Sequence, residues 1–292
     1  MDLILIPIDK NYALQSIESL LASFHISHKK IKALEIANAL FLNGKNVSLT
    51  ELLSQGDKLE IDVASEEKLD YIPDIGKITC LYEDDWVYVL DKPPGIIIHP
   101  EFKTETGTLA NLAASFLEAR NIDRQVRYLH RLDKDTSGVI LFAKHFLAHS
   151  FLDYHWNHID VSREYLALVE GKMEKRQGKI DLPIGKDRHL NNKYIVYRGG
   201  KNAITRYEVV AEYTNCSLVR LWLETGRTHQ IRVHMAYSGH PLLGDKIYGA
   251  KSKYDGRILL HSAKISFIHP LTKNILEVSS PLPEDFQKWL ND

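Results

Sequence analysis

The feature that most constrains the fold is the order of strand-like and helical segments after residue 76. Runs of β-branched and aromatic residues follow one another with short turns between them, and few segments show helical spacing. Because helices do not alternate with strands, as a parallel sheet requires, this order predicts an α+β protein with a mostly antiparallel mixed sheet. The predicted strands are residues 78–82, 86–90, 139–143, 164–169, 203–211, 217–223 and 258–268, and the predicted helices are 108–120, 228–238 and 283–290.

The first 65 residues predict a separate small unit of two helices and a short sheet. Apolar residues from Tyr12 to Phe24 recur at helical spacing, and Ser27 is expected to cap a second helix. This second helix is expected to carry Ile31, Leu34, Ile36 and Leu40. Asn43-Gly44 is a strong hairpin-turn signal, and Gly56 precedes a final strand.

The division into domains follows from the composition along the chain. Residues 66–76 are polar, contain Pro73 and are expected to link the unit at 1–65 to a larger domain at 77–292. With 292 residues and 44% hydrophobic content, the chain is long enough for two domains with buried cores.

The cysteines and the first residues bear on the cell compartment. Cys80 and Cys216 show no CxxC spacing, so neither a disulfide framework nor a zinc cluster is indicated, and a reducing cytoplasm fits. The apolar residues 3–8 are too few to span a membrane, and they lack the basic start and the cleavage site of an export signal. We therefore expect a cytoplasmic monomer without a membrane partner.

Charge is distributed unevenly along the chain, although the net charge is only −1. All thirteen arginines lie between Arg120 and Arg257, and this segment holds 24 Lys and Arg against 15 Asp and Glu, a net charge of +9. The rest of the chain carries −10. Because arginine suits planar, bidentate contacts with phosphate, the basic middle segment favours a polyanionic ligand. A salt-bridged, solvated surface is the alternative for many of these charges.

Residues 130–138, with the sequence HRLDKDTSG, are the strongest candidate for a reactive site. They precede the strand-like segment 139–143, so Asp133 is expected in an exposed loop between two extended segments, where catalytic groups are commonly placed. A carboxylate in such a loop can serve as a nucleophile. The alternative is a capping role within the turn.

The first unit resembles the small αL RNA-binding fold that is appended to many RNA-modifying enzymes, through its phrases NGKNV and QGDKLEI. In that family a basic helix face contacts RNA, which implies RNA binding by Lys29, Lys30 and Lys32 here. The arginines usual in that family are absent, and the segment has a net charge of −2. A role in folding or docking is the alternative.

Residues 76–290 resemble the RluA-type RNA pseudouridine synthases through several motifs in that family's order. These motifs are VLDKPPG at 89–95, HRLDKDTSG at 130–138, REYLALVEG at 163–171, GKNAITRY at 200–207, GRTHQIRVHM at 226–235, GHPLLGD at 239–245 and LHSA at 260–263. One departure is Ser262, where the family more often has alanine.

The resemblance implies an isomerisation that detaches uracil from the ribose at N1, turns the base and rejoins it through C5. Asp133 is by resemblance the catalytic carboxylate, which either adds covalently to the sugar or base or assists loss of a ribose proton. Arg227 is implied to form an ion pair that keeps Asp133 ionised and oriented. Tyr165 is implied to be the ring against which the target base packs.

A uridine within folded RNA reaches such a pocket only if it leaves its stack, so base flipping is expected. In this family the arginine beside the catalytic aspartate, here Arg131, can occupy the space that the base vacates. The residues assigned to substrate binding are His130, Arg131, Thr136 and Leu260. The polar loop 187–198 carries Arg188 and Lys193, which are expected to contact the RNA backbone, although an ordinary solvated loop is the alternative.

We therefore expect an RNA pseudouridine synthase whose partner is structured RNA. Large-subunit ribosomal RNA is favoured by the appended αL-like unit, and transfer RNA is the alternative. Neither cofactor nor metal is expected, because His229 and His234 are five residues apart and no ligand set accompanies them. Two other hypotheses are an RNA-binding or ribosome-assembly protein without catalysis, and a Mg²⁺-dependent phosphatase that uses Asp133 in a DxDx[TV]-like motif.

Overall fold

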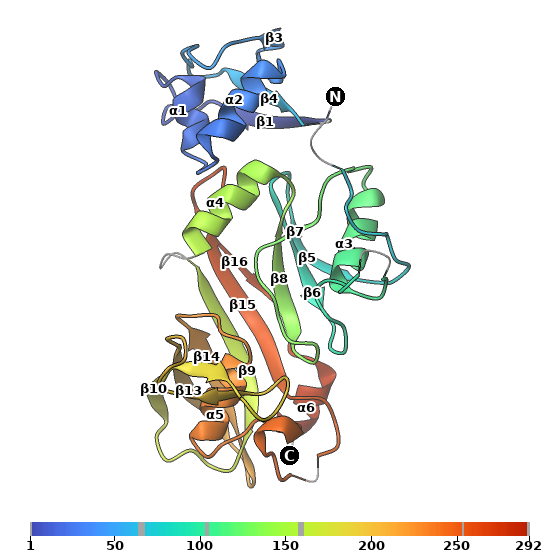
Figure 1. Cartoon of the computed structure of the whole chain (residues 1–292), viewed down its shortest axis with the longest axis vertical. Coiled ribbons are helices and arrows are strands. Elements are labelled where there is room, and N and C mark those ends of the chain that lie inside the picture. Colours follow the sequence, from blue (N-terminus) through green and yellow to red (C-terminus); the bar gives the residue numbers. More distant parts are fainter. Residues whose placement is uncertain (1, 64–67, 103–104, 157–160, 253, 291–292) are drawn as a thin grey trace.

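The computed structural model describes residues 2–63, 68–102, 105–156, 161–252 and 254–290 (Figure 1). Its large sheet contains β5 (Thr79–Glu83), β6 (Val87–Lys92), β7 (Arg127–Tyr128), β8 (Ser137–Ala143), β9 (Ser162–Glu170), β10 (Gln177–Asp181), β13 (Ile204–Glu212), β14 (Cys216–Leu223), β15 (Leu260–Ile268) and β16 (Ile275–Ser279). The strand order is β10-β13-β14-β9-β15-β8-β6-β5, with β16 beside β15 and β7 beside β8. Among the described pairings of this sheet, that of β8 with β15 is parallel and the others are antiparallel. The predicted α+β class is therefore confirmed.

Each predicted strand and helix of this part has a counterpart. The three predicted helices correspond to α3 (Leu109–Glu118), α5 (Gln230–Tyr237) and α6 (Glu284–Leu290). The sequence patterns did not predict helix α4 (Phe146–Trp156) or the short 3-10 helix η1 (Lys246–Tyr248). They also did not predict strands β7, β10 and β16 of the large sheet, or the hairpin of β11 (Ile184–Lys186) and β12 (Tyr194–Val196). The prediction of a loop at 187–198 was therefore wrong at its C-terminal end, where β12 pairs with β11.

The first unit contains a smaller sheet with the order β1-β4-β2-β3, in which the strands are β1 (Leu3–Pro7), β2 (Leu40–Leu42), β3 (Lys45–Asn46) and β4 (Lys58–Asp62). Helices α1 (Ile17–Ala22) and α2 (His28–Ile36) accompany it. Ser27 caps α2 as predicted, because its hydroxyl accepts a hydrogen bond from the Lys30 N–H at 3.3 Å. Asn43 and Gly44 have φ values of 54° and 77° and form the predicted turn between β2 and β3.

Three details of this unit differ from the prediction. The first helix is shorter than 12–24, because Leu14 has a left-handed φ of 67° that a helix excludes. Leu40 lies at the start of β2 rather than in the second helix. The sequence analysis did not identify β1, whose residues Ile4 and Ile6 are buried while Leu3 and Leu5 are exposed.

The two units pack against each other through apolar side chains. The ring of Phe24 stacks on that of Trp86 with centroids 5.4 Å apart. The Lys273 ammonium lies 4.5 Å from the Phe24 ring centroid and 3.7 Å from that of Phe151 in α4. At the edge of this contact the buried Arg124 Nε donates to the Asp2 carboxylate at 2.7 Å. The predicted linker between the units lies partly outside the described residues, and its described part, 68–76, forms neither helix nor strand.

Strand β8 is the centre of the core and follows the Asp133 loop directly. All seven of its residues are buried. Ile140 and Phe142 pack in one apolar cluster with residues of α3, whereas Val139 and Leu141 pack in another with residues of α4. Because both faces of β8 are covered, the loop that precedes it is attached to a rigid element.

Candidate active site

The loop that carries Asp133 is held by cationic side chains from distant parts of the chain. The fully buried ammonium of Lys92 donates to the carbonyls of Pro93, Lys134 and Thr136 at 3.0, 2.9 and 2.8 Å. Arg257 donates to the Asp135 carbonyl at 2.9 Å. These bonds satisfy carbonyls that would otherwise be unpaired within the turn, and they fix the backbone on both sides of Asp133.

Gly138 allows this loop to enter the sheet beside β15. Its φ is 112°, and a Cβ atom there would lie 2.1 Å from the carbonyl oxygen of Ser262. No other residue could adopt this conformation at so close an approach without displacing the backbone of β15. The glycine at the end of the HRLDKDTSG motif is therefore required by the parallel contact of β8 with β15.

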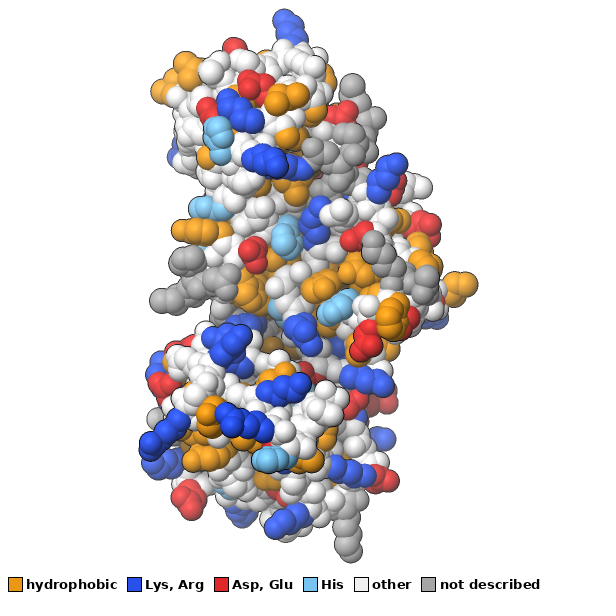
Figure 2. Space-filling model, viewed as in Figure 1, with side chains coloured by type: hydrophobic (Ala, Val, Ile, Leu, Met, Phe, Trp, Pro, Cys, Tyr) orange, Lys and Arg blue, Asp and Glu red, His pale blue; other side chains and the backbone are white. Residues whose placement is uncertain are grey.

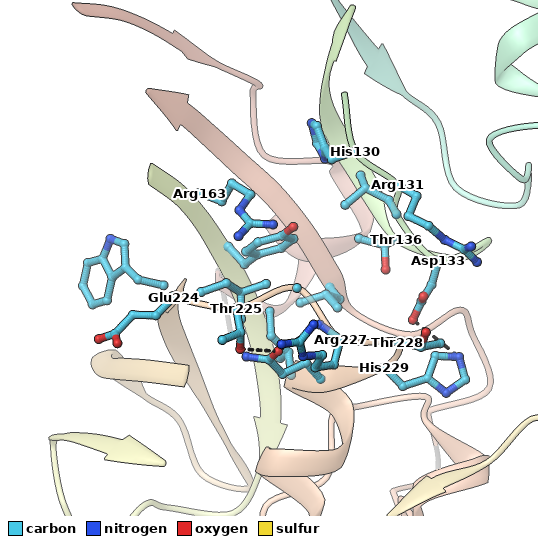
Figure 3. Close-up of a pocket in the computed structure, with 18 of the residues that line it drawn as sticks. His130, Arg131, Asp133, Thr136, Arg163, Glu224, Thr225, Arg227, Thr228 and His229 are labelled. Carbon is cyan, nitrogen blue, oxygen red and sulfur yellow. Dashed lines mark hydrogen bonds and ion pairs between the residues drawn. The ribbon is translucent and has the colours of Figure 1, made fainter. Parts of the chain in front are cut away.

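A single pocket of about 940 Å³ brings together seven of the predicted site residues (Figure 3). The predicted residues that line it are His130, Arg131, Asp133, Thr136, Tyr165, Arg227 and Leu260. They come from the loop before β8, from β9, from the turn before α5 and from β15. The pocket therefore unites motifs that are far apart in the sequence.

The ion pair of Asp133 corrects one prediction. Asp133 Oδ2 lies 3.2 Å from Nη1 of Arg232 in α5. Arg227, which was expected in this position, is exposed and donates from Nε to the Asn202 carbonyl at 2.9 Å. The reason is local, because α5 begins only at Gln230 and leaves Arg227 in the preceding turn.

Arg232 is part of a buried charge network. Its Nε and Nη2 donate to the two carboxylate oxygens of Asp245 at 2.7 and 3.0 Å, a bidentate contact, and Asp245 is fully buried. Burial by itself would lower the pKa of Arg232, but its hydrogen bonds to Asp245 and Asp133 and the charges of these two carboxylates together outweigh burial and raise the pKa. Arg232 therefore remains charged and offers its third nitrogen to Asp133. One signal in the sequence could have identified Arg232, because it lies between the apolar Ile231 and Val233 in a predicted helix. Arginine is rarely buried unless it has a charged partner.

His229 is the second group beside Asp133. Its Nε2 lies 3.7 Å from Asp133 Oδ2, and its Nδ1 lies 2.8 Å from the Tyr248 hydroxyl oxygen. Burial lowers the pKa of His229. From the sequence, His229 was considered as a metal ligand and that role was rejected; the structure places it in the pocket next to the candidate catalytic carboxylate.

The turn before α5 is organised by the amide of Gln230. Its Oε1 accepts hydrogen bonds from the Thr225 hydroxyl at 2.8 Å and from the Arg227 N–H at 3.0 Å, and its Nε2 donates to the Ile204 carbonyl at 2.9 Å. One buried side chain therefore ties this wall of the pocket to β13.

Tyr165 and Leu260 form the apolar part of the pocket. Tyr165 on β9 and Leu260 at the start of β15 are each 4% exposed. Burial raises the pKa of Tyr165, so its phenol stays protonated at neutral pH. A flat apolar surface with one polar tip is suited to packing against a nucleobase.

His130 forms the back of the pocket rather than a titrating group. Its ring stacks on Trp156 with centroids 4.8 Å apart, and its Nε2 accepts a hydrogen bond from the Leu141 N–H at 3.2 Å. Burial lowers its pKa to about 3, with the Arg163 charge adding to the effect. The ring is therefore neutral throughout the physiological range.

Buried neutral histidines predict a loss of stability in mild acid. Burial lowers the pKa of His130 to about 3 and that of His261 to about 4, whereas unfolded histidines bind a proton below about pH 6.5. Unfolding is thus accompanied by proton uptake as the pH falls. We expect the free energy of unfolding, measured with urea, to decrease between pH 7 and pH 5 by about 2 kcal/mol for each of these two residues.

A matched pair of variants checks the source of this loss. His130→Gln should reduce the decrease between pH 7 and pH 5 by about 2 kcal/mol. His189→Gln, at an exposed position, should leave it unchanged. Equal decreases in the two variants would contradict the assignment.

The residues predicted to bind RNA occupy different environments. On α2, Lys29 is exposed, the Lys30 ammonium lies 4.7 Å from the Phe146 ring centroid, and Lys32 lies 3.7 Å from Glu18 and 3.6 Å from Glu35. Lys30 and Lys32 therefore contact groups of the protein itself. Arg188 and Lys193 lie close to the hairpin of β11 and β12, 5.9 Å from the ring centroids of Tyr197 and Tyr248 respectively. Their RNA contacts stay predictions.

Positive charge gathers on one part of the surface. Lys and Arg side chains are frequent over the lower part of the face in Figure 2, where Figure 1 places β9, β10, β13 and β14.

Among the described residues, no group of three or more His, Cys, Asp and Glu side chains is arranged to hold a metal ion. Within the same residues, no helix has the length and apolar character needed to cross a membrane.

The sequence of this chain is similar to those of known proteins over most of its length. The family model described as RNA pseudouridylate synthase matches residues 86–237, more than half of the chain. The uncharacterized RNA pseudouridine synthase YhcT of Bacillus subtilis is 41% identical over 264 residues, which are 90% of this chain and 84% of that protein. The chain belongs to the RNA pseudouridine synthase family.

The synthase has further relatives with defined names. Ribosomal large subunit pseudouridine synthase D of Neisseria meningitidis (serogroup A) is 36% identical over 268 residues, 87% of this chain and 71% of that protein. The solved structure of human RNA Pseudouridylate Synthase Domain Containing 1 has the same fold, with a TM-score of 0.59 and 24% identity over 71% of this chain and 86% of that chain. These matches confirm the predicted family and the predicted class of enzyme, an isomerase that acts on RNA. The phosphatase hypothesis and the hypothesis of a protein without catalysis were wrong.

Proposed function

We propose that the synthase converts uridine to pseudouridine in large-subunit ribosomal RNA, with Asp133 as the catalytic carboxylate acting on a flipped-out base. The observation that carries the proposal is the Asp133 carboxylate at the pocket wall, 3.2 Å from the charged Arg232. The ribosomal substrate is supported by the relative from Neisseria meningitidis, which bears that substrate in its name. Transfer RNA is the competing substrate.

The proposed reaction balances without an added reagent. The bond from ribose C1′ to uracil N1 breaks, the base turns, and C1′ bonds to C5. The hydrogen on C5 leaves as a proton, while N1 gains one. Asp133 assists either by adding covalently to the sugar or base or by removing a ribose proton, and both routes need it as a carboxylate. The hydrogen bond that Arg232 Nη1 donates to Oδ2 of Asp133 at 3.2 Å orients the carboxylate for either route.

The neighbours of Asp133 suit a flipped nucleoside. Tyr165 and Leu260 offer apolar surface to a uracil ring, and the Tyr165 hydroxyl is a candidate for moving a proton at the base. Arg131 is exposed beside Asp133, where its planar guanidinium is available to fill the gap left in the RNA stack (Figure 3). His130 and Thr136 are buried side chains that line the same pocket.

Base-resolution mapping of pseudouridine in cellular RNA tests substrate and site together. RNA is compared from cells with the gene, without it, and without it but supplied with either the wild-type chain or Asp133→Asn. We expect one or more large-subunit ribosomal sites to be lost and to return only with the wild-type chain. Loss confined to transfer RNA would overturn the ribosomal assignment, and restoration by Asp133→Asn would overturn the catalytic one.

A further inference from the structure

We infer that His229 is a positioning residue for the catalytic carboxylate, held by Tyr248 in the tautomer whose Nε2–H points at Asp133. This inference rests on the proposed role of Asp133. Three independent features of the described structure support it: the backbone of His229, the hydrogen bonds of Tyr248, and the way the contacts of Asp133 are divided between its two oxygens.

The backbone at His229 is in a conformation that side chains usually avoid. Its φ of 57° and ψ of 20° are left-handed, at the residue that directly precedes α5. The side chain makes no hydrogen bond that would cap the helix. A strained residue that does not stabilise its own helix is a signal of function, and here the strain directs the imidazole to Asp133 rather than to the helix end.

The hydrogen bonds of Tyr248 select the tautomer. The Tyr248 oxygen accepts a hydrogen bond from the Tyr194 N–H at 3.0 Å, and it lies 2.8 Å from His229 Nδ1. With the oxygen engaged as an acceptor, its own O–H is free to donate to Nδ1, which leaves the imidazole proton on Nε2. The other tautomer would direct the lone pair of Nε2 at a carboxylate, an arrangement that is electrostatically unfavourable.

Burial keeps the ring of His229 neutral in this arrangement, while the charges around it act in opposite directions. Asp133 and Asp245 favour the protonated ring, whereas Arg232 and Arg131 oppose it. Burial has the largest effect and lowers the pKa of His229. The ring therefore offers a neutral N–H next to the fixed charge of Arg232. A neutral ring whose proton is on Nε2 does not compete with Asp133 for the proton that is removed from the substrate.

The contacts of Asp133 leave one of its oxygens uncommitted. Arg232 Nη1 and His229 Nε2 both approach Oδ2, at 3.2 and 3.7 Å. Among the described residues, no side chain donates a hydrogen bond to Oδ1. The hydrogen bond from Arg232 orients the carboxylate, the His229 Nε2 lies near the same oxygen, and Oδ1 is left to react. The 3.7 Å distance is too long for a hydrogen bond, but catalytic contacts without substrate are often long and shorten when substrate binds.

The same contacts connect His229 to the surface hairpin. Tyr194 belongs to β12, and its ring packs edge-on against His229 with centroids 5.6 Å apart. Tyr248 packs edge-on from another side, at 5.7 Å. The hairpin that carries the predicted RNA contact Lys193 thus also supplies one of the two rings that pack against His229, and its Tyr194 N–H holds the Tyr248 hydroxyl.

Two measurements test the inference. The first is long-range ¹H–¹⁵N correlation spectroscopy of the full chain labelled at histidine, with the His229 signals assigned by their loss in His229→Gln. At neutral pH we expect a protonated Nε2 and an unprotonated Nδ1. This readout needs no RNA, so it stands even if the proposed substrate is wrong. A proton on Nδ1 would overturn the inference.

The second measurement is turnover of an unmodified large-subunit ribosomal RNA transcript. We expect His229→Ala to lower kcat about 10- to 100-fold with KM within about threefold of wild type, as for other residues that orient a reactive group. His229→Gln, which retains an N–H donor, should recover part of the loss. Tyr248→Phe should lower kcat less than His229→Ala does. His240→Gln is the matched control and should leave kcat unchanged, because His240 lies beyond the other end of α5 and the hydrogen bond of its Nδ1 is with the Glu170 carbonyl.

The outcomes separate this inference from the proposed function. Wild-type activity that is lost in Asp133→Asn but unchanged in His229→Ala would overturn the inference alone. A wild-type chain without activity on this transcript would count against the proposed substrate, and the spectroscopic result would then decide the role of His229. If His229→Ala changes KM and leaves kcat unchanged, the inference that His229 positions Asp133 is also overturned.

Discussion

Replacing Asp133 with asparagine is expected to lower the rate of pseudouridine formation at least about a thousandfold, because the proposed reaction requires a carboxylate at this position and an amide cannot replace it. The amide has nearly the shape of the carboxylate, and the backbone of the turn is held by Lys92 and Arg257 rather than by the Asp133 side chain. The fold should therefore survive. Turnover with saturating RNA and RNA affinity are measured on the same preparation.

The neighbouring carboxylate provides a matched control. Asp135→Asn changes the net charge by the same amount within the same turn, so both variants should alter RNA affinity equally. Asp135 contributes its backbone carbonyl to Arg257, which the substitution leaves in place. We expect kcat within about threefold of wild type. If both variants lose activity to the same extent, the turn rather than Asp133 is what matters.

The second large effect is expected at Arg232. Arg232→Met leaves the fully buried carboxylate of Asp245 without its bidentate partner, which should cost about 3–5 kcal/mol of unfolding free energy. It also removes the charge next to Asp133, so kcat should fall about a hundredfold or more. Arg232→Lys retains the charge without the planar fork and should lose activity with a smaller loss of stability. Urea unfolding and turnover separate the two effects.

Arg227 is the control for this pair of effects. It lies in the same GRTHQIR motif and lines the same pocket, but it is exposed and its Nε contacts the Asn202 carbonyl. Arg227→Met should change stability by less than about 1 kcal/mol and kcat by less than about tenfold. The double variant Arg232→Met with Asp245→Asn should be more stable than Arg232→Met, because it no longer has an unpaired buried carboxylate. It should remain as inactive as Arg232→Met, because the charge next to Asp133 is still missing. A larger effect at Arg227 than at Arg232 would restore the original ion-pair prediction.

The exchange of Arg227 for Arg232 illustrates where sequence reasoning reached its limit. The motif contains two arginines five residues apart, and which one meets Asp133 depends on where the helix begins. The sequence predicts a start at Thr228, whereas the left-handed His229 delays it to Gln230. That conformation depends on contacts with Tyr248 and Asp133, which are distant in the sequence. Residue type and order alone do not contain this information.

The elements that the sequence analysis missed have related physical causes. Helix α4 has buried residues on more than one face, because it packs against β8 on one side and the first unit on the other, and this removes the amphipathic period that identifies a surface helix. In β1 the exposed Leu3 and Leu5 hide the alternation of buried Ile4 and Ile6. Strands β11 and β12 have only three residues each, too few for a pattern. The long strands of the large sheet were predicted because their apolar runs match their burial.

The stacking of Phe24 on Trp86 has a consequence for how the enzyme can be divided. A catalytic fragment without residues 2–63 would expose Trp86, Phe146 and Phe151 together, a contiguous apolar area of the kind that drives self-association. The first unit therefore covers an apolar surface of the larger domain, formed by Trp86 and helix α4. A domain that replaced this unit would have to cover the same aromatic side chains. Covering them is a sufficient reason for the unit to be present, so its presence does not by itself require that it bind RNA.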